Sequence, residues 1–229
     1  MDIGVPYRDL GALDVSALTE AVKAMPDEAW TRNTFRQDAL ADPAHTATMA
    51  LIFKHEYDPR YNSANFKYME DLVEVWARNK GLPADDYRPI AREETDLGFV
   101  YTFPEWRDWE ALLRPILDQA LERLGRTERG VVTRLALVKL KPNGKINPHI
   151  DGQPMAAVAH RLHVPVVVPP GVEYRIGPAK FTMKPGHLYD FNNRMLHSVK
   201  HTGKRPRVNL FIDYYPNPGI PRAAPFGHF

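Results

Sequence analysis

The second half of the chain consists of short apolar segments separated by turn residues, and no other feature of the sequence limits the fold so strongly. Pro169-Pro170-Gly171, Gly177-Pro178 and Pro185-Gly186 mark the corners. Many short strands at this spacing are typical of an antiparallel sandwich or jelly roll rather than of a parallel sheet. The predicted strands are 131–139, 161–168, 173–176, 180–183, 187–191, 197–201 and 207–214.

The first half of the chain carries apolar residues at helical spacing instead. Asp14-Val15-Ser16 is a plausible start for one helix, and Gly125 a plausible end for the longest one, which has Pro115 inside it. The predicted helices are 14–25, 68–80 and 104–124.

Together the two patterns predict an α+β fold with a mainly β core, a double-stranded β-helix (jelly roll, cupin-like) with a helical N-terminal half packed on one sheet. We expect one domain over residues 1–229, with a mostly helical N-terminal region at 1–128 and the β-helix core at 129–229. A chain of 229 residues with 44% hydrophobic content can bury a core of that size.

Composition narrows the classes of function. The chain has no cysteine, which excludes disulfides, thiolate metal sites and cysteine nucleophiles. A net charge of +2 gives no electrostatic case for binding nucleic acid, so no nucleic-acid partner is expected. No apolar run approaches the roughly 20 residues of a membrane span, and no signal peptide is evident. We therefore expect a cytoplasmic protein without a membrane partner; its oligomeric state is left open.

One set of residues in the predicted β core carries metal chemistry. His149-Ile150-Asp151 is followed by His197, and Arg207 comes ten residues after that. Side chains at positions i and i+2 of a strand point to one face, so His149 and Asp151 can converge on one ion. Two histidines and one carboxylate in this order are typical of a facial triad that binds Fe(II) and leaves three positions open. Arg207 would pair with a dicarboxylate cosubstrate, which indicates an oxygenase.

Taken singly, each of these residues has an ordinary structural explanation, namely a hydrogen-bonded histidine or a surface aspartate in a β domain. Their order and spacing favour the metal site over that explanation.

The run from Lys141 to Tyr215 resembles the aspartyl/asparaginyl β-hydroxylase family of Fe(II)/2-oxoglutarate oxygenases. The resemblance covers about a third of the chain, and the first 125 residues show nothing comparable. The matching segments are Lys141-Pro142, Pro148-His149, Arg161-Leu162-His163-Val164-Pro165-Val166, Lys184-Pro185-Gly186-His187-Leu188, Asn192-Asn193 with His197, and Arg207-Val208-Asn209-Leu210-Phe211-Ile212-Asp213.

The resemblance implies that His149 and His197 bind iron and that Arg207 binds the distal carboxylate of 2-oxoglutarate. Arg161 and His163, which alternate on one strand, would support the cosubstrate from the same cavity. Asp151 is a departure, because the animal members of the family have a glycine there. A carboxylate at this position strengthens the iron assignment and weakens the inference that the substrate is the same. No side chain is expected to act as a catalytic acid or base beyond the metal site.

The resemblance also implies the activity, hydroxylation of an unactivated C–H bond at the β-carbon of an aspartyl, asparaginyl or related amino-acid unit that is free, peptidyl or carrier-bound. The cofactors would be Fe(II), 2-oxoglutarate and O2, with ascorbate supporting activity in vitro. Two alternatives stay open. One is a metal-binding cupin that is not an oxygenase. The other is an alkylated-nucleic-acid demethylase of the same fold, whose signature would need a second arginine where this chain has Asp213.

Overall fold

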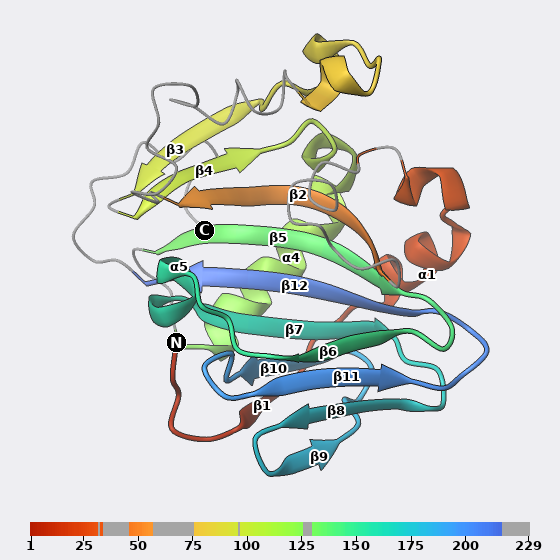
Figure 1. Ribbon diagram of the computed structural model, residues 1–229, viewed down its shortest axis with the longest axis vertical. Helices are drawn as coiled ribbons and strands as arrows, with labels where there is room; N and C mark the ends of the chain where they lie inside the picture. Colours follow the sequence, from red (N-terminus) through yellow and green to blue (C-terminus); the bar gives the residue numbers. More distant parts are fainter. Residues whose placement is uncertain (32, 34–45, 57–75, 96, 126–129, 217–229) are drawn as a thin grey trace.

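The computed structural model describes residues 1–31, 33, 46–56, 76–95, 97–125 and 130–216 (Figure 1). Within these residues the strands form two antiparallel sheets. The large sheet has the order β1-β10-β7-β12-β5-β2-β4-β3, and the small sheet has the order β6-β11-β8-β9. The strands are β1 Tyr7–Ala12, β2 Thr46–Glu56, β3 Ala91–Thr95, β4 Gly98–Thr102, β5 Val131–Leu140, β6 Lys145–His149, β7 His160–Val167, β8 Val172–Ile176, β9 Ala179–Phe181, β10 His187–Phe191, β11 His197–His201 and β12 Arg207–Tyr215.

The path of the chain through the two sheets defines the fold. From β5 onward the chain passes from the large sheet to the small one and back: β5, β7, β10 and β12 lie in the large sheet, and β6, β8, β9 and β11 lie in the small one. Strands that alternate between two facing antiparallel sheets form a double-stranded β-helix, or jelly roll. The predicted fold class of the core is confirmed.

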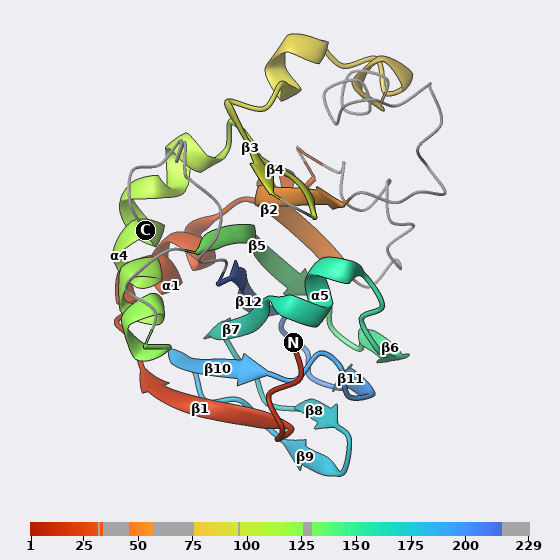
Figure 2. The same cartoon turned by 90° about the vertical axis from the view of Figure 1, so that its left-hand side faces the viewer.

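The part of the large sheet formed by β5, β12, β7 and β10 is covered on both faces (Figure 2). One face packs against helices α1 (Ser16–Ala24) and α4 (Trp106–Arg123) through a cluster that includes Leu162, Leu210 and Leu117. The opposite face meets the small sheet through a second cluster that includes Tyr174 and Phe191. Because both faces are covered, the residues of β7 are buried along nearly its whole length, whichever way they point.

The predicted helices at 14–25 and 104–124 are present as α1 and α4. Helix α4 continues through Pro115, and its buried residues form one stripe toward the sheet. Of the prediction at 68–80, residues 76–79 are helical and 68–75 lie outside the described residues. None of the described helices combines the length and the apolar character that crossing a membrane requires.

The prediction of a mostly helical N-terminal region was only partly right, because residues before 128 also supply strands β1 to β4. Strand β1 pairs with β10 at one edge of the large sheet, and β2 pairs with β5 and so extends the sheet beyond the core. The apolar run at 49–53 in β2 is buried without interruption, so it shows none of the alternation that identifies a strand. The proposed division at 128/129 stays a prediction, since one sheet contains strands from both parts.

Two elements of the core were also missed. Strand β6 is short and mostly exposed, with the partly buried Ile146 near its start, and it is a strand because it pairs with β11. Helix α5 (Pro154–Val158) has a single turn, which is too short to show periodicity. Both elements flank the candidate site.

Candidate metal centre and cosubstrate cavity

A cavity of about 330 Å3 opens between the two sheets and contains all six residues that the sequence singled out. This volume is in the range of small-molecule sites, which are mostly apolar with a few convergent polar groups. Its walls combine apolar side chains from β5, β6, β11 and β12 with a set of charged and imidazole groups. The six predicted residues in the lining are His149, Asp151, Arg161, His163, His197 and Arg207.

Two neighbouring strands of the small sheet bring the two predicted histidine ligands together, with Asp151 just beyond the end of one of them. His149 is the last residue of β6, and it lies directly opposite His197, the first residue of β11. The two ring centroids are 4.2 Å apart, and His149 Nε2 lies 3.7 Å from Asp151 Oδ1. One ligand atom from each of the three residues lies within 4.8 Å of the others. This spacing is suitable for one shared metal ion.

Backbone carbonyls orient both imidazole rings in the same way. His149 Nδ1 is 2.8 Å from the carbonyl oxygen of Asn147, and His197 Nδ1 is 2.9 Å from that of Met195. A carbonyl oxygen can only accept, so Nδ1 carries the proton in each ring and Nε2 keeps its lone pair for a metal. Burial lowers the pKa of His197, which favours the neutral form that coordinates metals.

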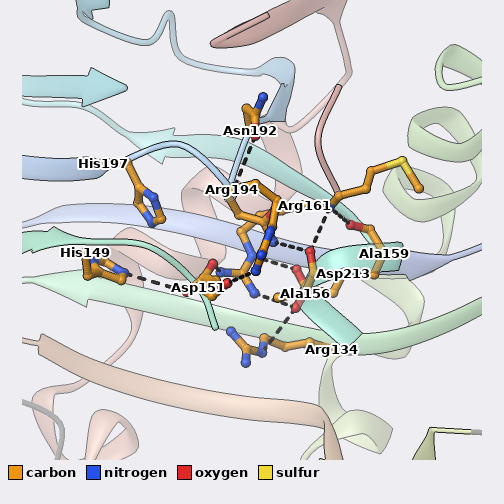
Figure 3. A network of polar contacts seen from close by, with 12 residues as sticks. Arg134, His149, Asp151, Ala156, Ala159, Arg161, Asn192, Arg194, His197 and Asp213 are labelled. Atoms are coloured by element: carbon orange, nitrogen blue, oxygen red, sulfur yellow. Dashed lines mark hydrogen bonds and ion pairs between the residues drawn. The ribbon is translucent and has the colours of Figure 1, made fainter. Parts of the chain in front are cut away.

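Asp151 is held at its backbone and at its carboxylate (Figure 3). Its N–H donates to the carbonyl oxygen of Asn193 at 3.1 Å, and its own carbonyl accepts from Arg194. Its Oδ2 accepts a hydrogen bond from Nη1 of Arg161. Asp151 lies two residues beyond the end of β6, and these contacts replace the strand as the means of fixing its position.

Arg161 connects Asp151 to a second carboxylate, Asp213. Its Nε and Nη2 donate to the two oxygens of Asp213, each at 2.9 Å, in the parallel geometry typical of an arginine–carboxylate pair. Arg134 Nε and Lys54 Nζ lie 3.5 and 4.0 Å from Asp213 Oδ2. Burial alone would raise the pKa of the Asp213 carboxyl, but the charges of Arg161 and Arg134 hold it well below its usual range.

At the other end of the cavity, Arg207 is completely buried with part of its guanidinium unsatisfied. Its Nε donates to Tyr174 Oη at 2.8 Å, and the guanidinium carbon lies 5.3 Å from the centre of the Tyr174 ring. Nη1 and Nη2 have no hydrogen-bond partner among the described residues. A buried charged donor without a partner is costly, so this pair of nitrogens fits a bidentate anionic ligand such as a carboxylate.

His163 lies between the two ends and presents one ring nitrogen to the cavity. Its Nδ1 accepts from Asn209 Nδ2 at 3.1 Å, so Nε2 carries the proton, and in the described part of the chain nothing accepts it. Burial first, and the charge of Arg207 second, keep the pKa of His163 well below its ordinary value. His163 therefore offers a neutral N–H donor beside Arg207.

Several polar groups around the cavity were not singled out from the sequence. Asp213 could have been found, because it has the same strand parity as Arg207 and so faces the same side of β12. Asn193 and Tyr174 act through contacts that no spacing predicts. Thr46, whose buried Oγ1 lacks a partner among the described residues, comes from a strand outside the recognisable core.

The donor set fits a particular kind of metal chemistry. Two imidazole nitrogens and one carboxylate oxygen on one side of an ion are the ligands of mononuclear non-haem Fe(II) sites that keep open positions for cosubstrate and oxygen. The partnerless Arg207 nitrogens are suitable for the far carboxylate of 2-oxoglutarate. A double-stranded β-helix with this set between its sheets defines the class of non-haem iron oxygenases.

Comparison with known proteins places the chain within that class. The model of the aspartyl/asparaginyl β-hydroxylase family matches residues 107–216, from α4 to the end of β12. No curated protein gives a significant match to the chain. The chain is thus a 2-oxoglutarate- and Fe(II)-dependent oxygenase, and its residues 107–216 are similar to the aspartyl/asparaginyl β-hydroxylase family.

Solved structures show more distant likenesses. AviO1 from Streptomyces viridochromogenes is 16% identical, over 79% of this chain and 93% of that one, with a TM-score of 0.40. An oxidoreductase of the 2OG-Fe(II) oxygenase family from Burkholderia pseudomallei is 14% identical, over 81% and 91%, with a TM-score of 0.41. The viral collagen prolyl hydroxylase of Paramecium bursaria Chlorella virus 1 is 13% identical, over 77% and 98%, with a TM-score of 0.37. The fold assignment rests on the strand order and not on these likenesses.

Proposed function

We propose that the protein hydroxylates an unactivated C–H bond at the β-carbon of an aspartyl, asparaginyl or related amino-acid unit, free, peptidyl or carrier-bound. One observation carries the oxygenase part of the proposal: a His-Asp-His set with ligand atoms within 4.8 Å shares a cavity with Arg207, whose Nη1 and Nη2 have no hydrogen-bond partner in the described part of the chain. The family match supports the amino-acid substrate.

In this proposal His149, Asp151 and His197 hold Fe(II), and Arg207 binds the distal carboxylate of 2-oxoglutarate. His163 would donate its Nε2–H to the cosubstrate, because it is neutral and lines the same cavity. Tyr174 would keep the Arg207 fork in place by accepting from Nε, which leaves both terminal nitrogens for the ligand.

When bound there, Fe(II) and 2-oxoglutarate supply the oxidising power for hydroxylation. The protein contributes the open face of the metal site, the anchoring of the cosubstrate at one end and the exclusion of water by the walls of β5, β11 and β12. No side chain of the cavity needs to move a proton at the reacting carbon.

The test is succinate formation by the purified protein with Fe(II), ascorbate and 2-oxoglutarate, with and without a panel of amino acids and Asp- or Asn-containing peptides. We expect succinate that depends on iron and that is stimulated by one member of the panel. His149→Ala should abolish succinate formation. The control His187→Gln should leave it unchanged, because His187 lies on β10, outside the cavity lining, where it contacts Asp9.

Two outcomes would count against the proposal in different ways. Succinate without stimulation by any amino-acid compound, but with stimulation by another substrate, would overturn only the substrate assignment. Failure to form succinate, together with failure of the Mn(II)-loaded protein to bind 2-oxoglutarate, would favour a metal-binding cupin instead.

A further inference from the structure

Arg161 was expected to support the cosubstrate, but its contacts point to another role. All three of its guanidinium nitrogens donate to carboxylates, Nε and Nη2 to Asp213 and Nη1 to Asp151. Arg207, in contrast, has two nitrogens in the same cavity for which the described residues provide no hydrogen-bond partner. The two arginines of the cavity therefore have different tasks.

We infer that Asp213 and Arg161 are positioning residues that hold Asp151 as a ligand through a single oxygen. The inference rests on the proposed metal site. Arg161 occupies Oδ2 of Asp151, and the other oxygen, Oδ1, faces Nε2 of His149 at 3.7 Å. Only Oδ1 is then directed to the place where the two imidazoles converge.

Arg161 and Asp213 are buried and held to each other by two hydrogen bonds, which keeps the arrangement rigid. Arg161 and Asp213 are 5% and 1% exposed, and two parallel hydrogen bonds fix the guanidinium plane against Asp213. Arg134 approaches Asp213 from the neighbouring strand. The backbone of Asp151 is fixed separately by Asn193 and Arg194. The carboxylate is thus in place before a metal binds, which reduces the ordering that binding requires.

The first experiment measures metal affinity rather than turnover, with Mn(II) titrated into the metal-free protein and the free ion followed by EPR. Asp213→Asn should lower Mn(II) affinity about 10- to 100-fold, the usual effect of losing a residue that orients a ligand. At saturating Mn(II), its affinity for 2-oxoglutarate should stay within about twofold of the wild type. Arg161→Lys, which keeps the charge but loses the fork, should behave in the same way.

Asp190→Asn is the matched control. Asp190 is also a fully buried carboxylate in the large sheet, paired with His160 and Arg8, but it does not contact Arg161 or Asp151. It should retain wild-type Mn(II) affinity even if it loses stability. Equal losses of Mn(II) affinity in Asp190→Asn and Asp213→Asn would mean that any damage to the sheet weakens the site, and the inference would fail.

A double-mutant cycle isolates the path through Asp151. Ni(II) is used for all four proteins, because it binds nitrogen and oxygen sites more tightly than Mn(II). In the Asp151→Gly background, Asp213→Asn should change Ni(II) affinity by about twofold or less. A full 10-fold loss there would overturn the inference. If Asp213→Asn instead loses affinity for 2-oxoglutarate at saturating metal, Arg161 supports the cosubstrate, as the sequence predicted, and the positioning role is wrong.

These outcomes are distinguishable from failure of the proposed function. If the oxygenase function is wrong, the wild-type protein forms no succinate and binds no 2-oxoglutarate in the presence of metal, whatever its affinity for Mn(II). The positioning role is tested by differences between variants that do bind metal.

Discussion

The two ends of the cavity differ in how their polar groups are satisfied. At the metal end, the side chain of His149 is 44% exposed, and each histidine has one ring nitrogen bound to a carbonyl and the other directed inward. At the cosubstrate end, Arg207 is fully buried and two of its nitrogens lack partners in the described structure. The first end is prepared for its ligand at little cost in stability, whereas the second carries a desolvated charge that a ligand would relieve.

The sharpest test of the metal end is removal of one ligand. His197→Ala should abolish metal binding and turnover, because it removes one of the two imidazole ligands of the proposed site. The fold should persist, since His197 lies at the start of β11 and its loss leaves the hydrogen bonds of that strand intact. Mn(II) titration together with far-UV circular dichroism checks this. Loss of the fold in His197→Ala would show that the His197 side chain is also needed for the stability of the protein.

Substitution of Asp213 tests whether its buried charge stabilises the fold in addition to positioning the proposed metal ligand. Asp213→Ala should destabilise the metal-free protein by about 3–5 kcal/mol, because it leaves Arg161 buried without its main partner. Urea unfolding in EDTA measures the change. A loss below about 1 kcal/mol would indicate that Arg161 finds another partner or water.

For Arg207, at the proposed cosubstrate end, we expect substitutions to weaken ligand binding, whereas removing its charge should not lower the stability of the ligand-free protein. Arg207→Ala should weaken 2-oxoglutarate binding by about 2–5 kcal/mol if the pair with the carboxylate is buried. Arg207→Met should lose the same binding without losing stability in the absence of ligand, because the unsatisfied charge is removed and the volume is largely kept. Calorimetric titration at saturating Mn(II) and urea unfolding are the measurements. Unchanged cosubstrate affinity would refute the assignment of Arg207.

The smallest expected effect is a dependence of stability on pH through His163. Its pKa is lower in the folded protein than its ordinary value of 6.5, so the unfolded chain binds more protons between the two values. Stability should therefore be complete above pH 6.5 and fall as the pH drops below it, by up to about 1.4 kcal/mol per pH unit. His163→Gln should show a shallower decline than the wild type between pH 7.5 and 5.5, with both proteins measured by urea unfolding in EDTA. Identical pH profiles would contradict the burial of a neutral His163.

The strand pattern after residue 130 was sufficient to predict the core. Short segments with proline and glycine between them leave few alternatives to an antiparallel two-sheet fold, and β10 and β11 lie at the predicted residues 187–191 and 197–201. The six candidate residues were also predictable as a group, because strand parity and order along the chain determine which side chains can face one cavity.

Only the tertiary structure showed which partners the polar groups of those residues have. The fork of Arg161 on Asp213, the partnerless nitrogens of Arg207 and the carbonyls that orient His149 and His197 depend on contacts between residues distant in the chain or on turn geometry. Strands β2 and β6 were likewise unpredictable, since one is buried on both faces and the other exists by pairing with β11. Local patterns report which side of an element is buried, whereas the partner of each polar group is determined by packing across the two sheets.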